Sequence, residues 1–184
     1  MKTCAAFLLL LLLTAFGPAA VSYHALPASS RITWTGYAEV GGYAPSGTVQ
    51  LRQGTVAYDA GRVRAARFEF DMRTIQHEQA ALATHLRGPD FFDAAQFPTA
   101  VFELRALRSG HATGQLTLHG ITRPVQFPAT LAELPNGHLR LRGAATLDRT
   151  AFGVNYNSSS FFQNLGSYAI RNDFQLAFDV EMAH

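Results

Sequence analysis

A few histidine and acidic side chains are spaced in ways that invite a metal site. His77 and Glu78 precede His85 within one stretch of the chain. A metalloprotease-type zinc site needs two histidines four residues apart on one helix, whereas His77 and His85 are eight apart. On a helix they would lie about two turns from each other, too far for one ion. We therefore predict surface positions for these residues and no metal site.

Nucleophilic and nucleotide-binding motifs are also missing. Serines cluster at 158–160, but the nucleophile-elbow pattern G-x-S-x-G does not occur in the sequence. The glycine-rich stretch 41–47 lacks the lysine of a phosphate-binding loop and reads as a hairpin turn. An enzyme would have to use Asp90, Asp148 or His119 as its acid or base. We expect no catalysis and no cofactor.

The charge balance and the first residues indicate where the protein acts. The chain has 15 Lys and Arg against 13 Asp and Glu and no basic run, so no nucleic-acid partner is expected. Residues 1–22 show a charged start, an apolar run and small residues, typical of a cleavable secretory signal peptide. Cleavage between Ala19 and Tyr23 would remove the single cysteine, Cys4. We expect a periplasmic protein without disulfides and without stable membrane insertion after cleavage.

Period-two alternation of apolar and polar residues dominates the chain from Arg31 onward. In the clearest case Phe174, Leu176 and Phe178 alternate with polar residues. Such a run predicts a strand with one buried face. Nine runs are expected as strands: Ile32–Val40, Thr48–Arg52, Thr55–Tyr58, Ala66–Arg73, Ala100–Ala106, Ala112–Leu118, Val125–Leu131, Leu139–Leu147 and Phe174–Met182.

These strands must be arranged so that their apolar faces meet. Eight or nine antiparallel strands joined by short turns form either a sandwich or a closed barrel, and closure removes exposed edges. Small residues on the inward faces favour a cavity. We predict an all-β fold, a single antiparallel barrel of about eight strands in residues 23–184. A short helix and turn are expected near residues 76–94, where helix-forming residues end at Gly88 and Pro89.

Three motifs, in order, resemble the signatures of the YceI-like family of exported bacterial proteins. They are HLRGPDFFDAAQFPTAVFE at 85–103, GQLTLHGITRPV at 114–125 and DRTAFGV at 148–154. The resemblance covers about Tyr23 to Ala183. It implies an extended, lipocalin-like barrel that binds a polyprenyl or quinone tail in an apolar channel. Many members carry a histidine in the first strand, whereas this region holds Tyr37 here, so the headgroup preference of that hairpin stays open.

Given this resemblance, we predict that inward-facing and loop side chains contact the tail. The predicted ligand-binding residues are Trp34, Phe68, Phe70, Leu86, Phe91, Phe92, Phe97, Phe102, Leu116, Phe127, Leu141, Phe152, Phe161, Phe162, Phe174 and Phe178. Phe91, Phe92 and Phe97 either contact the ligand or only plug the barrel end. The long segment 150–172 is expected to pack over one end of the barrel.

Three arginines inside the motifs are candidates for contact with a headgroup oxygen: Arg87, Arg123 and Arg149. The alternative is that they pin loops by pairing with Asp90, Asp93 or Asp148. The leading hypothesis is a protein that binds, carries or sequesters an amphiphilic isoprenoid lipid as its small-molecule partner. A filled barrel acting as a stress or interaction protein and an enzyme acting on such a lipid are the alternatives. An exposed aromatic mouth would also suit a homodimer.

Overall fold

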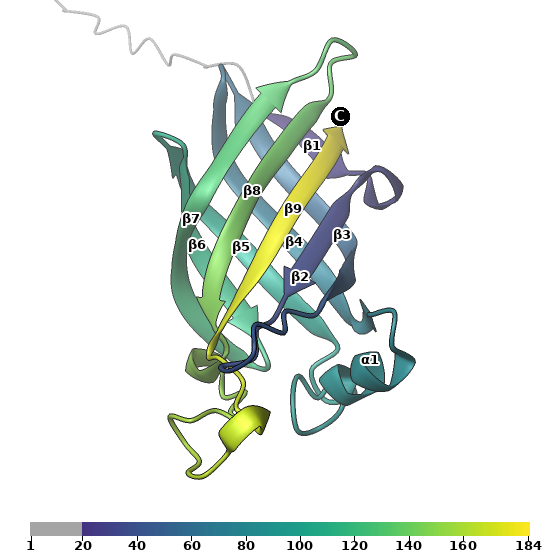
Figure 1. The fold of residues 1–184 in the computed structure, drawn as a ribbon. Helices are drawn as coiled ribbons and strands as arrows, with labels where there is room; N and C mark the ends of the chain where they lie inside the picture. Colours follow the sequence, from purple (N-terminus) through teal and green to yellow (C-terminus); the bar gives the residue numbers. More distant parts are fainter. Residues whose placement is uncertain (1–19) are drawn as a thin grey trace, which may run out of the picture.

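A single sheet closes on itself as an antiparallel β-barrel in the computed structural model, which describes residues 20–184 (Figure 1). The signal-peptide prediction concerns residues outside this range, apart from its last few. The strands are β1 (Val21–Ala25), β2 (Arg31–Thr35), β3 (Ser46–Asp59), β4 (Arg62–Gln76), β5 (Thr99–Arg108), β6 (His111–Leu118), β7 (Ile121–Glu133), β8 (Leu139–Asp148) and β9 (Asp173–Ala183). The helical elements are α1 (Ala80–Arg87) and the 3-10 turns η1 (Pro27–Ser29), η2 (Arg149–Phe152) and η3 (Gly166–Tyr168). None of the helices in this part of the chain is long and apolar enough to span a membrane.

The nine strands fill eight positions in the barrel wall. Strands β1 and β2 share one position, because both pair with β3 on one side and with β9 on the other. The turn η1 separates them. Pairing of β3 with β4 closes the ring. The predicted antiparallel barrel of about eight strands is confirmed, and so is the short helix inserted between two strands, α1, which ends at Gly88.

Alternation places the apolar residues inside, as the sequence predicts. On β8, Leu141, Ala145 and Leu147 are buried, whereas Arg142 and Ala144 between them are exposed. Burying one face of strands β2 to β9 in this way makes the interior of the barrel the single hydrophobic core.

The strand boundaries differ from the prediction around β3. The runs 48–52 and 55–58 belong to one continuous strand, β3, rather than to two. A β-bulge between Leu51 and Gln53 shifts the register against β4. Burial accordingly changes phase, from Val49 and Leu51 before the bulge to Gly54 and Val56 after it. An extra residue in one strand reverses the inward face, so the alternation looks interrupted.

The chain near the first strands also differs from the prediction. Strand β2 ends at Thr35 rather than at Val40, and residues 36–45 leave the wall as a loop. Only an isolated bridge between Ala38 and Ile170 continues the pairing. Strand β1 was not predicted. It begins at Val21, two residues before the expected start of the domain, and none of its side chains is buried, so it gives no burial signal.

One end of the barrel, here called the closed end, carries short turns that join β3 to β4, β5 to β6 and β7 to β8 (Figure 1). Val56, Leu139 and Met182 fill its interior, each at most 2% exposed. The hydroxyl of Tyr58 on β3 donates a hydrogen bond of 2.6 Å across this end to the carboxylate of Glu133 on β7. This hydrogen bond, with burial, raises the pKa of Tyr58 to about 12. Packing and one cross-barrel hydrogen bond therefore seal this end.

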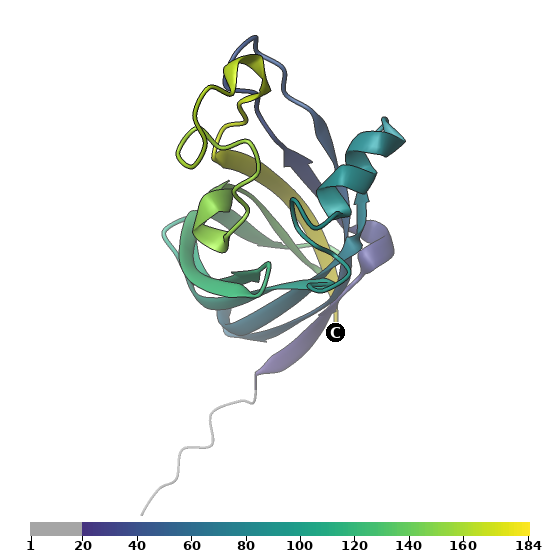
Figure 2. The ribbon, with the colours of Figure 1, turned by 90° about the horizontal axis from the view of Figure 1, so that it is seen from below.

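The opposite end, here called the mouth, carries the long connections. They are residues 36–45, residues 77–98 with α1, and residues 149–172 with η2 and η3. Figure 2 looks onto this end and shows the three segments arranged around the barrel. The two ends therefore have different constructions, and the mouth is where a ligand would enter.

Candidate functional site

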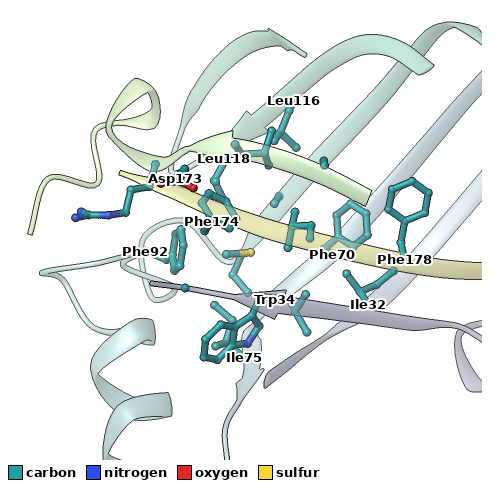
Figure 3. Close-up of a pocket in the computed structure, with 18 of the residues that line it drawn as sticks. Ile32, Trp34, Phe70, Ile75, Phe92, Leu116, Leu118, Asp173, Phe174 and Phe178 are labelled. Atoms are coloured by element: carbon teal, nitrogen blue, oxygen red, sulfur yellow. The ribbon is translucent and has the colours of Figure 1, made fainter. Parts of the chain in front are cut away.

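A cavity of about 260 Å³ runs from the mouth into the barrel. Its wall carries side chains from every strand between β2 and β9, among them Ile32, Phe70 and Phe178, which Figure 3 shows around a common space. The wall is almost wholly apolar. The charged residues that line it are Arg149, Arg171 and Asp173, all at the mouth. The site is therefore an apolar tube with its polar groups at the entrance.

Aromatic rings pack close to the wall over glycines, which have no Cβ atom. A Cβ atom at Gly143 would lie 2.5 Å from the ring of Phe178, and one at Gly54 would lie 2.5 Å from the ring of Phe68. Trp34 leans over Gly47 and Phe102 over Gly114 in the same way. Small residues on the inward faces, Ala100, Ala112 and Ala145, leave further room. This pairing of rings with glycines keeps the centre of the barrel open.

The aromatic turn after α1 forms one side of the mouth. Phe91 and Phe92 both line the cavity, and Phe91 is buried. The ring of His85 in α1 packs on Phe91 at 5.3 Å and on Tyr156 at 4.7 Å between ring centroids. Phe97 instead packs on His119, away from the cavity wall. The turn therefore both supplies wall residues and joins segment 77–98 to segment 149–172.

Arg149 holds segment 149–172 in place. The side chain is 3% exposed, and its guanidinium donates hydrogen bonds to the backbone carbonyls of Val154 (2.7 Å), Ile170 (3.0 Å) and Arg171 (3.1 Å). Burial lowers the pKa of Arg149. The guanidinium also lies 5.8 Å from the ring centroid of Phe91. A cation placed in this way ties both ends of the segment to the aromatic turn.

Segment 149–172 packs over the barrel end, as the sequence predicts. The buried hydroxyl of Ser158 donates to Oδ1 of Asn172 at 2.7 Å. The segment is also bonded to the first loop, because Glu39 donates its backbone N–H to Ala169 O (2.9 Å) and Arg171 donates to Tyr37 O (2.9 Å). The loop 36–45 and the segment 149–172 are therefore hydrogen-bonded to each other beside the cavity.

Most of the predicted ligand-binding residues lie on the cavity wall. They are Trp34, Phe68, Phe70, Leu86, Phe91, Phe92, Phe102, Leu116, Phe127, Leu141, Phe174 and Phe178. The other four lie off the wall. Phe97 packs on His119, Phe152 is the buried last residue of η2, and Phe161 and Phe162 are exposed at the mouth.

Sequence reasoning missed aliphatic wall residues such as Met72, Leu118 and Leu176. A signal for them was present, because each lies two residues from a predicted wall residue of its strand, Phe70, Leu116 or Phe174. Tyr37, Tyr43 and Pro45 also line the entrance, and the predicted extended run over 32–40 gave no reason to place them there.

The other two candidate headgroup arginines are not on the wall. Arg87 donates to Ile75 O (3.0 Å) and to the hydroxyl of Thr84 (3.2 Å). Arg123 donates to Ala151 O at 3.1 Å. Within residues 20–184, none of Arg87, Arg123 and Arg149 forms an ion pair with Asp90, Asp93 or Asp148. The three arginines bond to backbone carbonyls instead.

The candidate acid and base groups do not converge on the cavity. Asp90, Asp148 and His119 are absent from the described wall. Asp148 accepts hydrogen bonds from the backbone N–H (2.8 Å) and hydroxyl (2.6 Å) of Thr150 and so caps η2. His119 is hydrogen-bonded to Phe152 O at 3.0 Å. In the described part of the chain, no group of three or more His, Cys, Asp or Glu residues is arranged to hold a metal ion.

A barrel sealed at one end and opening at the other into an apolar cavity has the architecture of barrels with one internal site for a small ligand. Residues 23–182 match the family model of the YceI-like domain, so the chain belongs to the YceI-like family. The relationship extends over nearly the whole barrel.

Among curated relatives, a UPF0312 protein of Pseudomonas savastanoi pv. phaseolicola is 32% identical over 120 residues, covering 59% of this chain and 62% of the relative. A UPF0312 protein of Pseudomonas putida (strain W619) is 31% identical over 120 residues, with the same coverage of both chains. The matched region thus spans less than two thirds of the length of these relatives.

Two solved structures share the fold. BcnA of Burkholderia cenocepacia has a TM-score of 0.67 at 20% identity and covers 87% of this chain and 99% of its own. A polyisoprenoid binding domain from Saccharophagus degradans, implicated in plant cell wall breakdown, has a TM-score of 0.69 at 11% identity and covers 90% and 98%. At these identities the likeness shows a common fold.

Proposed function

We propose that the protein binds an amphiphilic isoprenoid lipid, with the tail in the barrel cavity and the polar head at the mouth. One observation carries this proposal: the cavity is apolar along its length and has its charged residues, Arg149, Arg171 and Asp173, only at the entrance. A tail gains from leaving water, and a head stays where water and charges are. A structural relative that is a polyisoprenoid binding domain supports the choice of tail.

The cavity volume bounds the tail that fits. At about 30 Å³ for each water molecule, 260 Å³ holds roughly nine waters. A methylene group takes about the same space, so roughly nine carbon atoms, about two isoprene units, would fit inside. At about −0.3 kcal/mol per heavy atom, these carbons contribute about −3 kcal/mol, a Kd of about 10⁻² M. Contacts of the headgroup would tighten binding from this value.

The open cavity argues against the two alternative functions, a filled barrel without a ligand and an enzyme. A filled barrel, acting without a ligand, would leave no room at its centre, whereas this one keeps about 260 Å³ open. An enzyme would need its acid or base beside the ligand, and neither His119 nor Asp148 lies on the wall. We therefore propose binding, carriage or sequestration without catalysis. We further propose that the protein acts in the periplasm, because residues 1–22 carry a signal-peptide pattern.

A test measures the affinity for fluorescent polyprenyl analogues of increasing length, from about one to eight isoprene units. Affinity should rise steeply up to about two units and then level off, because further carbons stay outside the cavity. The variant Ala145→Phe places a ring inside the cavity and should weaken binding by about tenfold or more.

The matched control is Ala144→Phe, on the same strand but on the exposed face. It adds the same ring outside the barrel and should leave the affinity unchanged. Equal binding by the two variants, or no binding of any analogue by the unmodified protein, would refute the proposal.

A further inference from the structure

Exposed large apolar side chains gather at the mouth. Val40, Tyr43, Phe161, Phe162 and Tyr168, here called the mouth patch, are between 50% and 76% exposed. The remaining exposed large apolar residue of the described chain, Val21, lies at the start of β1 and pairs with Tyr58 at the closed end. Scattered exposed apolar residues are ordinary, but a patch confined to one end of a protein marks an interaction site.

The tips of the loops that carry the mouth patch are uncharged. No Asp, Glu, Lys, Arg or His occurs between residues 150 and 170, nor between residues 40 and 51. The charged residues lie at the borders of these stretches. Arg171 is paired with Asp173 (2.7 Å), whereas the exposed Glu39 accepts a hydrogen bond from the neutral hydroxyl of Ser159 (2.8 Å). Taking the loop tips out of water while these borders stay in it would therefore move no charge into an apolar medium.

The mouth patch is continuous with the cavity. Tyr43 is 55% exposed and also lines the cavity entrance. The two loops are fixed to each other through the Ala38–Ile170 bridge and the backbone hydrogen bond from Glu39 to Ala169. A flat object that covered the patch would therefore lie directly over the opening of the tube.

The area and composition of the mouth patch fit a lipid surface better than a second copy of the chain. Four aromatic side chains of about 150–250 Å² each, a little over half exposed, offer about 500 Å². A stable protein interface needs about 800 Å² on each partner. Tyrosine and phenylalanine at loop tips are suited to the boundary between headgroups and acyl chains.

We propose that the mouth patch docks on the surface of an uncharged lipid bilayer and opens the cavity directly onto the acyl chains. Docking is transient and uses side chains at the tips of loops, with no spanning segment. The role in tail transfer rests on the proposed function: a tail that passes between bilayer and cavity at this contact never crosses water. Because the patch carries no charge, docking should depend neither on anionic lipid nor on salt.

The experiment is flotation with vesicles of phosphatidylcholine, alone or with about one quarter phosphatidylglycerol, in about 0.1 and 0.5 M salt. The ligand-free protein should float equally in all four conditions. Val40→Ser with Tyr168→Ser, and separately Phe161→Ser with Phe162→Ser, should each lower the bound-to-free ratio by about tenfold or more. The control, Ala144→Ser, changes an exposed apolar side chain on β8, away from the mouth patch, and should float like the unmodified protein.

The rate of ligand uptake from vesicles then tests whether docking assists transfer of the tail. The variant carrying Val40→Ser and Tyr168→Ser should take up a polyprenyl analogue from vesicles about tenfold more slowly. Its equilibrium affinity for the same analogue in vesicle-free solution should not change, because neither residue lines the cavity.

Four outcomes would overturn docking: no flotation of the unmodified protein, equal flotation of the variants, flotation that needs phosphatidylglycerol and is lost at high salt, or a dimer in light scattering that the patch substitutions abolish. Failure of the proposed function would give a different experimental result. Analogues would then not bind in vesicle-free solution, while flotation of the ligand-free protein would still report on docking.

Discussion

Replacing Arg149 by methionine tests whether one buried cation holds the mouth together. Methionine has a similar length but no N–H groups, so the carbonyls of Val154, Ile170 and Arg171 would lose their donor. Arg149 is 3% exposed, and water does not easily replace it. The substitution therefore removes three hydrogen bonds from a site that is largely buried from solvent.

The expected loss of folding stability is the balance of two opposing effects. Leaving the buried carbonyl of Val154 and the partly buried carbonyls of Ile170 and Arg171 without a donor costs up to about 1–3 kcal/mol each. In the other direction, methionine carries no charge, so the free-energy cost of burying the guanidinium is removed. That cost is the reason why burial lowers the pKa of Arg149. We expect a net loss of about 3 kcal/mol, which lowers Tm by about 6–12 °C for a chain of this size.

Thermal and urea unfolding measure this loss, and amide hydrogen exchange locates it in residues 149–172. Arg142→Met is the matched control, because Arg142 lies on β8, the strand just before Arg149, is exposed and pairs with Asp179 at the surface. That substitution should change stability by less than about 1 kcal/mol. If Arg149→Met unfolds within about 2 °C of the unmodified protein, the carbonyls do not depend on the guanidinium and the reasoning is refuted.

Two further substitutions test other parts of the barrel. Gly143→Ala should destabilise by about 1–3 kcal/mol and weaken tail binding, because the added Cβ meets Pro128 O at 2.4 Å and the Phe178 ring at 2.5 Å; unchanged urea unfolding and affinity would contradict this. Tyr58→Phe should cost about 1 kcal/mol at neutral pH by removing the hydrogen bond to Glu133. Since the folded pKa of Tyr58 is raised to about 12, that stabilisation is present below about pH 10 and is lost as pH rises towards 12. The stability difference between the two proteins should therefore vanish there, and a difference that persists in alkaline unfolding would be the contrary result.

The cavity wall was predictable because alternation is a local signal. Each residue two positions from a predicted wall residue shares its face, so Phe174, Leu176 and Phe178 follow from one another. The short helix followed from its composition and from Gly88 at its end. These features need no knowledge of which strands are neighbours.

The features that keep the site open were not predictable in the same way. The contact of Gly143 with the Phe178 ring joins β8 and β9, and depends on the register between them. The carbonyls bonded to Arg149 come from residues up to 22 positions away. The bulge near Gln53 reverses the inward face, so local alternation pointed to two strands. Each of these depends on geometry that only the closed barrel defines.

The pairing of the last strand has a consequence for the order of folding. Strand β9 joins β8 on one side and β1 and β2 on the other, so the ring cannot close before residues 173–183 meet the start of the domain. Such non-local pairing makes a β-protein fold slowly, in about milliseconds to seconds. During that time the edges of β8 and of the first strands are open to pairing with other chains. Delay or truncation of this strand should therefore appear first as aggregation of newly made chains.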